Sequence, residues 1–133
     1  MGAVAGALVV VVRTPRYGFL PDVKPVSSSA GRAQGGFQAF ASRYVVPESA
    51  VGILDRLRQE APLRLERTTE VGGRRAWVVT IPRSKDGRPD MAYPPAREVT
   101  VVEGAPTSVE IREFRERGPL DTLVDWVRKP TGA

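Results

Sequence analysis

Hydrophobic residues recur at helical spacing in the middle of the chain. Val51, Leu54 and Leu57 lie three positions apart, which places them on one stripe of a helix. Pro62 follows and stops the pattern, because proline cannot continue a helix. The spacing predicts an amphipathic helix over residues 48–60.

A second helical pattern lies close to the C-terminal end. Leu120, Leu123, Val124 and Val127 occupy positions i, i+3, i+4 and i+7, as expected for one face of a helix. Trp126 stands at the edge of that stripe. Two interpretations remain open. The helix covers a sheet, or it forms a docking face through Leu123, Trp126 and Val127.

Between the two helical patterns the spacing is that of strands. β-branched and aromatic residues alternate with polar ones, and Gly72-Gly73 suits a two-residue hairpin turn because both positions tolerate positive φ. Leu63 and Leu65 are expected on one face of their strand, with Arg64 and Glu66 on the other. The pattern predicts two hairpins, formed by residues 63–71 with 75–81 and by 97–103 with 107–114.

These elements predict an α+β two-layer sandwich. We expect a four-stranded antiparallel sheet with two flanking helices, forming a compact domain over residues 47–133. Residues 21–46 are rich in Pro, Gly and Ser and are predicted to be a linker. Residues 1–20 are predicted to be an extended arm with an apolar tip and basic residues after it.

The apolar tip runs from Gly2 to Val12 without a charged residue. As a helix these eleven residues would rise only about 17 Å, against about 30 Å for the hydrocarbon core of a bilayer. The run is interpreted as a short membrane anchor, with the apolar core of a signal peptide and a buried strand over Leu8–Val12 as alternatives.

If the run is an anchor, its flanking residues make the contact with the membrane or a partner. Arg13 and Arg16 follow the run and no basic residue precedes it, which places the domain in the cytoplasm by the positive-inside rule. An extracytoplasmic location is the alternative. Tyr17 and Phe19 suit the headgroup level, or else they begin a loop packed on the domain. The predicted contact residues are Leu8, Val10, Val12, Arg13, Arg16, Tyr17 and Phe19.

Charge is unevenly distributed along the chain. The formal net charge is +5. Residues 1–47 hold five basic residues and one acidic residue, a net +4, whereas residues 48–133 hold fifteen and fourteen, a net +1. A duplex-binding domain usually has a face of one sign, because its affinity comes from neutralised phosphates. Nucleic-acid binding is therefore expected only of the basic arm, as an alternative function.

The residues available for catalysis are few. The chain has no His and no Cys, which excludes an imidazole base, a thiol nucleophile and a thiolate metal site. The carboxylate pairs Asp86 with Asp90 and Asp121 with Asp125 have no polar residues around them that suggest a reaction. We expect no enzyme activity, no catalytic residue, no cofactor and no metal.

One stretch resembles a known family. Val71-Gly72-Gly73-Arg74-Arg75-Ala76-Trp77-Val78-Val79, followed by the strand pair over 97–114, is similar to the later hairpins of periplasmic half-barrels that handle lipoproteins. The resemblance covers less than half of the chain and implies a curved sheet that holds acyl chains. The chain departs from the family where a helix is predicted in place of its next strand.

Three functions follow from these features. The first is a non-catalytic accessory subunit, attached through its arm to a bilayer or a larger membrane protein assembly, for example an energy-transducing complex, with the α+β domain as a docking module. The second is an exported lipid- or ligand-binding domain. The third is nucleic-acid binding through the arm.

Overall fold

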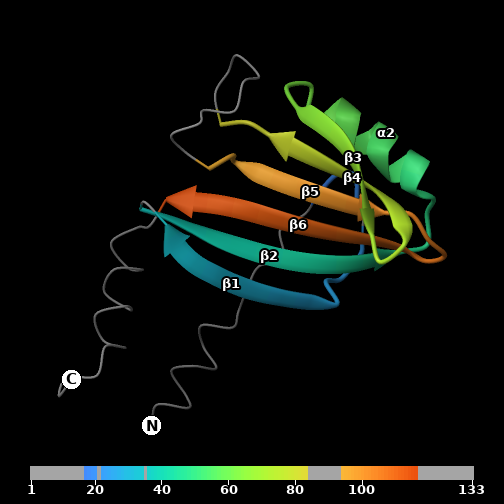
Figure 1. Ribbon diagram of the computed structural model, residues 1–133, viewed down its shortest axis with the longest axis horizontal. Helices are drawn as coiled ribbons and strands as arrows, with labels where there is room; N and C mark the ends of the chain where they lie inside the picture. Colours follow the sequence, from blue (N-terminus) through green and yellow to red (C-terminus); the bar gives the residue numbers. More distant parts are fainter. Residues whose placement is uncertain (1–16, 21, 35, 84–93, 117–133) are drawn as a thin grey trace, which may run out of the picture.

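The computed structural model describes residues 17–20, 22–34, 36–83 and 94–116. They form one six-stranded antiparallel sheet with one helix on it, in the strand order β1-β2-β6-β5-β4-β3 (Figure 1). The elements are β1 (Ser27–Gln34), β2 (Phe37–Val46), α2 (Ala50–Glu60), β3 (Leu65–Val71), β4 (Arg74–Ile81), β5 (Arg97–Val102) and β6 (Thr107–Glu116).

The predicted fold class, four strands with two flanking helices, is wrong. The sheet has six strands, and among the described residues there is a single helix. The two additional strands, β1 and β2, lie within residues 21–46, which were predicted to be a linker. The helix predicted near the C-terminus falls in residues 117–133, outside the described residues.

Tertiary pairing explains why a linker-like sequence forms strands. β2 is paired along its whole length with β6, from Phe37 opposite Glu116 to Val46 opposite Thr107. The other side of β2 pairs with β1. β2 is therefore an interior strand, and β1 forms the edge of the sheet. Weak local strand propensity is overridden when a neighbouring strand supplies the hydrogen-bond partners.

The helix α2 is confirmed, with a different buried stripe. Ser49 caps its start, where the hydroxyl accepts a hydrogen bond of 3.3 Å from the Gly52 amide. The residues facing the sheet are Ala50, Ile53, Leu54 and Leu57. Val51, which was expected on that stripe, is 59% exposed.

Both predicted hairpins are confirmed. β3 and β4 are joined at Gly72 and Gly73, whose φ angles of 58° and 78° lie in the left-handed region that glycine adopts without strain. β5 pairs with β6 from Arg97 opposite Glu113 onward. Leu63 and Leu65, which alternation places on one face, are both about half exposed.

The core lies between α2 and one face of the sheet. The sheet contributes aliphatic side chains from β4, β5 and β6, and Tyr44 and Val46 from β2. Residues 17–20 complete the layer beside the helix, with Phe19 fully buried. We call residues 17–20 the strap. The other face of the sheet carries no described helix.

Candidate functional site

The open face of the sheet, opposite α2, carries a groove. One row of residues crosses it in register: Arg67 on β3, Val78 on β4, Thr100 on β5, Glu110 on β6 and Arg43 on β2. The groove has a volume of about 510 Å³, within the range of ligand sites. Its position follows from strand alternation, since the neighbouring positions on β4, β5 and β6, such as Val79, Val99 and Ile111, point into the core.

Charged and hydroxyl side chains surround a small aliphatic floor in this groove. The polar lining residues are Arg43, Arg67, Thr69, Glu98, Thr100, Ser108, Glu110 and Arg112, and the aliphatic ones are Val71, Val78 and Val102. Guanidinium, carboxylate and hydroxyl groups suit a partner with polar or charged groups. An acyl chain would leave these groups without water, at a cost in free energy.

The charges in the groove are only partly paired. The Glu110 carboxylate lies 3.4 Å from Arg43 Nη2 and 3.2 Å from Arg112 Nε. Among the described residues, Arg67 has no carboxylate within ion-pair distance. Exposed ion pairs contribute at most about 1 kcal/mol to stability. These side chains are therefore better suited to recognition than to holding the fold together.

The strap places two of the predicted contact residues, Tyr17 and Phe19, in the core. Tyr17 is 5% exposed and Phe19 is fully buried, as expected if they begin a segment packed on the domain. The Arg97 guanidinium lies 5.1 Å from the Tyr17 ring and 5.7 Å from the Phe19 ring. These contacts fix the point from which the arm leaves the sheet.

Two carboxylates, one on β6 and one at the end of α2, accept hydrogen bonds from the strap. Tyr17 Oη donates a hydrogen bond to Glu113 Oε1 on β6. The Phe19 amide donates one of 3.2 Å to Glu60 Oε2 at the end of α2, whose other oxygen lies 3.3 Å from Arg97 Nη2. The strap is thereby connected to the helix and to the sheet by groups that the sequence pattern did not single out.

Burial perturbs the pKa of Tyr17, in the strap, and that of Tyr44, whose ring centroid lies 6.3 Å from the Tyr17 ring. Burial, and then the hydrogen bond to Glu113, raise the pKa of Tyr17 well above its usual value. Burial also raises the pKa of Tyr44, and the neighbouring Ser42 hydroxyl opposes that shift. Within the described residues, the Tyr44 hydroxyl and Arg97 Nε are buried without a hydrogen-bond partner of acceptable geometry. Ser42 therefore lies near the Tyr44 hydroxyl without forming a hydrogen bond to it.

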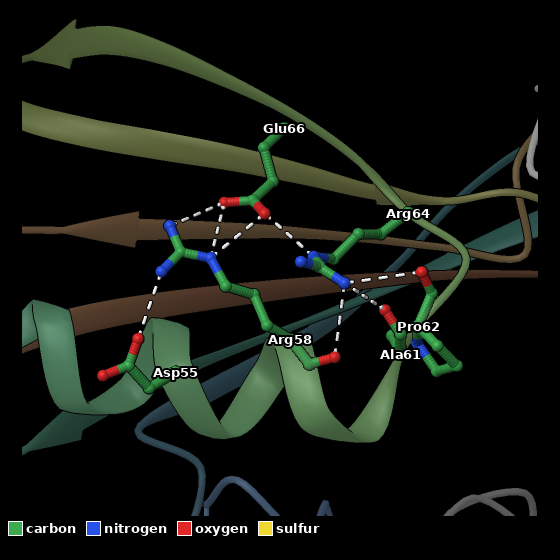
Figure 2. A network of polar contacts seen from close by, with 6 residues as sticks. All are labelled: Asp55, Arg58, Ala61, Pro62, Arg64 and Glu66. Atoms are coloured by element: carbon green, nitrogen blue, oxygen red, sulfur yellow. Dashed lines mark hydrogen bonds and ion pairs between the residues drawn. The ribbon is translucent and has the colours of Figure 1, made fainter.

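A second polar network joins α2 to β3 (Figure 2). Arg58 on the helix contacts Glu66 on the strand through Nε at 3.1 Å and Nη2 at 3.0 Å, and Asp55 through Nη1 at 3.1 Å. Arg64 Nε donates to the same Glu66 carboxylate at 2.8 Å. These guanidinium groups, Arg58 first, lower the pKa of Glu66.

Arg64 also closes the end of the helix. Its Nη1 donates hydrogen bonds to main-chain carbonyl oxygens in the last turn of the helix and directly after it (Figure 2). The acceptors are the carbonyl oxygens of Arg58 at 3.3 Å, Ala61 at 3.1 Å and Pro62 at 3.4 Å. The network fixes the connection by which the chain crosses from the helix to the sheet edge.

The other predicted site residues lie outside the described residues. These are the arm residues Leu8, Val10, Val12, Arg13 and Arg16, and the docking-face residues Leu123, Trp126 and Val127. The carboxylate pairs considered for catalysis, Asp86 with Asp90 and Asp121 with Asp125, also lie there.

Within the described residues, no three His, Cys, Asp or Glu side chains are grouped so that they could hold a metal ion. No helix within them is both long and apolar enough to cross a bilayer. Comparisons with protein-family models, curated proteins and solved structures found no match.

Sequence reasoning did not identify the groove. Its residues come from five strands, and one of these, β2, was not predicted to be a strand. The available signal was the alternation in β6, where Val109 and Ile111 point inward and Glu110 and Arg112 outward. That alternation was interpreted as a solvated face, and only the register shows that its charges lie beside those of β2 and β5.

Proposed function

We propose that this protein is a non-catalytic accessory subunit that is attached through its N-terminal arm to a membrane or a larger membrane protein assembly. The open face of its sheet binds a partner in this proposal. One observation carries it: the sheet is covered on one face by α2 and the strap, while the other presents a charged groove of about 510 Å³.

The strap supports a role in attachment. Residues 17–20 are part of the core, so that the arm begins at a fixed point of the domain. The apolar run Gly2–Val12 and the cations Arg13 and Arg16 directly precede this point. An attached arm would therefore hold the domain close to the attachment surface and limit its orientations. The flanking charges favour a cytoplasmic domain, with an extracytoplasmic domain as the alternative.

The groove supports binding of a polar partner over binding of an acyl chain. A lipid carrier needs an apolar cavity, but eight of the eleven lining residues of this groove are polar or charged. Nucleic-acid binding is an alternative for the arm and not for this groove, where Glu98 and Glu110 offset two of the three arginines. The mixture of both signs is typical of the surface that another protein recognises.

Site-specific photo-crosslinking in cells tests this proposal. A photo-reactive residue replaces Arg67 in the groove or, as the matched control, Arg56 on the exposed side of α2. We expect discrete protein adducts from position 67, few from position 56, and loss of the adducts when residues 2–12 are deleted. Equal adducts from both positions would contradict docking through the open face.

A further inference from the structure

The open face of the sheet becomes apolar beyond the groove, toward the end of β6. Strand alternation places Ala39 and Ala41 of β2 on the same face as Arg43, and Ala39 lies opposite Phe114 of β6. Ala39, Ala41 and Phe114 are half-buried, and among the described residues no helix lies on them. We call Phe37, Ala39, Ala41 and Phe114 the apolar patch.

A cation lies over one end of the apolar patch. The Arg83 guanidinium is 4.8 Å from the centre of the Phe37 ring, and its Nη2 donates a hydrogen bond of 2.8 Å to the Phe114 carbonyl oxygen. Among the described residues, Arg83 has no carboxylate within ion-pair distance. This cation is therefore available to an acidic group that approaches the open face.

Two carboxylates lie further along the same face. Glu110 is four residues before Phe114 on β6, and Glu98 on the neighbouring strand β5 lies opposite Arg112, two residues before Phe114 (Figure 1). At about 3.4 Å per residue, these levels are about 14 Å and about 7 Å from Phe114. Going back along β6 from its end, the open face therefore presents a cation first and then two anions.

The sequence after β6 has a complementary pattern. The helix predicted there lies outside the described residues, and its stripe of Leu and Val residues was not assigned a partner by the proposed function. Asp121 near its start and Arg128 near its end are seven positions apart, which places them on one side of a helix, about 10.5 Å from each other. That side adjoins the stripe, next to Val124.

The connection between β6 and this predicted helix is short. Residues 117–119 span at most about 11 Å, close to the distance of about 10 Å between packed layers. The helix therefore has to begin above the end of β6. On the α2 face, this end is polar, because Arg115 lies 5.1 Å over the Phe40 ring and Glu113 accepts the hydrogen bond from Tyr17. The open face offers the apolar patch instead.

We propose that residues 120–128 form a helix that packs on the apolar patch and runs antiparallel to β6. The apolar stripe then covers the patch, and Asp121 pairs with Arg83. Arg128, about 10.5 Å further along the helix axis, lies between the levels of Glu98 and Glu110. Apolar contact and the order of charges both favour this segment as the occupant.

The docked helix has a consequence for the groove. Glu98 and Glu110 line the groove, so the helix covers part of it, and a partner that binds there has to displace the helix. This competition rests on the proposed function, whereas the docking of the helix does not. The C-terminal segment is then an internal competitor that sets how tightly the open face binds its partner.

Disulfide formation between two introduced cysteines tests the docking, because the chain has no cysteine of its own. Val124→Cys is combined with Ala41→Cys on the open face or, as the matched control, with Ser42→Cys, which shares the α2 face with Tyr44. Both β2 positions are half-buried. The full chain is kept dilute in a mild non-ionic detergent, the intramolecular product is identified by its mass, and circular dichroism verifies each fold.

We expect the Ala41→Cys pair to form its disulfide at least about ten times faster than the Ser42→Cys pair, because docking raises the effective concentration on one face only. Reversing both charges, with Asp121→Arg and Arg128→Glu, should slow the faster reaction. Equal rates for the two pairs, or a rate that the reversal leaves unchanged, would overturn the proposal. No partner takes part in this experiment, so its failure is distinct from a failure of the photo-crosslinking test.

Discussion

The Tyr17 hydroxyl donates a hydrogen bond to the Glu113 carboxylate, which joins residues 96 positions apart in the sequence. This contact connects the strap to β6, the strand that pairs with β2 on one side and β5 on the other. The start of the folded region is therefore tied to the middle of the sheet. The strap and the sheet therefore belong to one folded unit.

The hydrogen bond can be tested by removing the hydroxyl group from each of two buried tyrosines, Tyr17 and Tyr44. Tyr17→Phe removes a donor to a charged acceptor, and we expect the free energy of unfolding to fall by about 1–2 kcal/mol. Tyr44→Phe removes a buried hydroxyl that has no hydrogen-bond partner in the described part of the chain, and we expect no loss of stability. Urea denaturation of both variants gives the comparison. Equal losses would contradict the assignment.

Alkaline pH should weaken the strap before it affects the rest of the sheet. Folding raises the pKa of Tyr17 and of Tyr44, because the core and, for Tyr17, the Glu113 carboxylate disfavour the phenolate. This contribution is complete below the unfolded pKa of about 10 and is lost as the pH rises above it. We expect the urea midpoint to fall between pH 9 and about pH 11. Tyr17→Phe should reduce this fall of the urea midpoint with pH. A fall as large as that of the unmodified chain would contradict the role given to Tyr17.

Phe19 should be one of the most costly residues to truncate. Its side chain is fully buried between α2 and the sheet, and we expect Phe19→Ala to lower the free energy of unfolding by about 3–5 kcal/mol. The control is Val51→Ala on the outer side of α2, where Val51 is 59% exposed and the effect should stay within about 0.5 kcal/mol. Thermal unfolding of both variants measures the difference. If Phe19→Ala is as mild as the control, the strap is not part of the core.

The network at the end of α2 should make the protein sensitive to acid. Hydrogen bonds from Arg58 and Arg64 lower the pKa of Glu66, so its contribution is present above the unfolded pKa of about 4.3 and is lost as the pH falls through the lower folded value. We expect Glu66→Gln to be destabilising at pH 7 and progressively less so as the pH falls below the unfolded pKa of about 4.3. Glu70→Gln on the same strand, which forms no ion pair within the described part of the chain, serves as the control. A loss that does not change with pH would contradict this role.

Local patterns in the sequence predicted those elements that depend on local chemistry. Gly72-Gly73 indicated the β3–β4 hairpin, and helical spacing indicated α2. Of the strands in 27–46, β1 was missed because Ser27–Gly31 has little strand propensity and is ordered by pairing with β2. The aromatic and β-branched residues of β2 are a strand signal that the linker interpretation overlooked. The exposure of Leu65 could not be predicted either, because alternation shows which residues share a face and not which face is covered.

The groove and the strap depend on long-range pairing in the same way. Arg43, Glu110 and Arg112 are neighbours because β2 lies beside β6, and no spacing along the chain indicates that arrangement. Likewise, Glu113 and Arg97 both contact Tyr17 because they lie opposite each other on the neighbouring strands β6 and β5.

The central claim is that the arm attaches the protein to a membrane or a membrane assembly while the folded domain stays intact. Membrane fractionation of cells that produce the full chain or a chain without residues 2–12 tests it most directly. Circular dichroism of the purified shortened chain verifies its fold. The account predicts that the full chain sediments with membranes and the shortened, folded chain stays in the supernatant. A full chain that remains in the supernatant, or a shortened chain that still sediments with membranes, would contradict it.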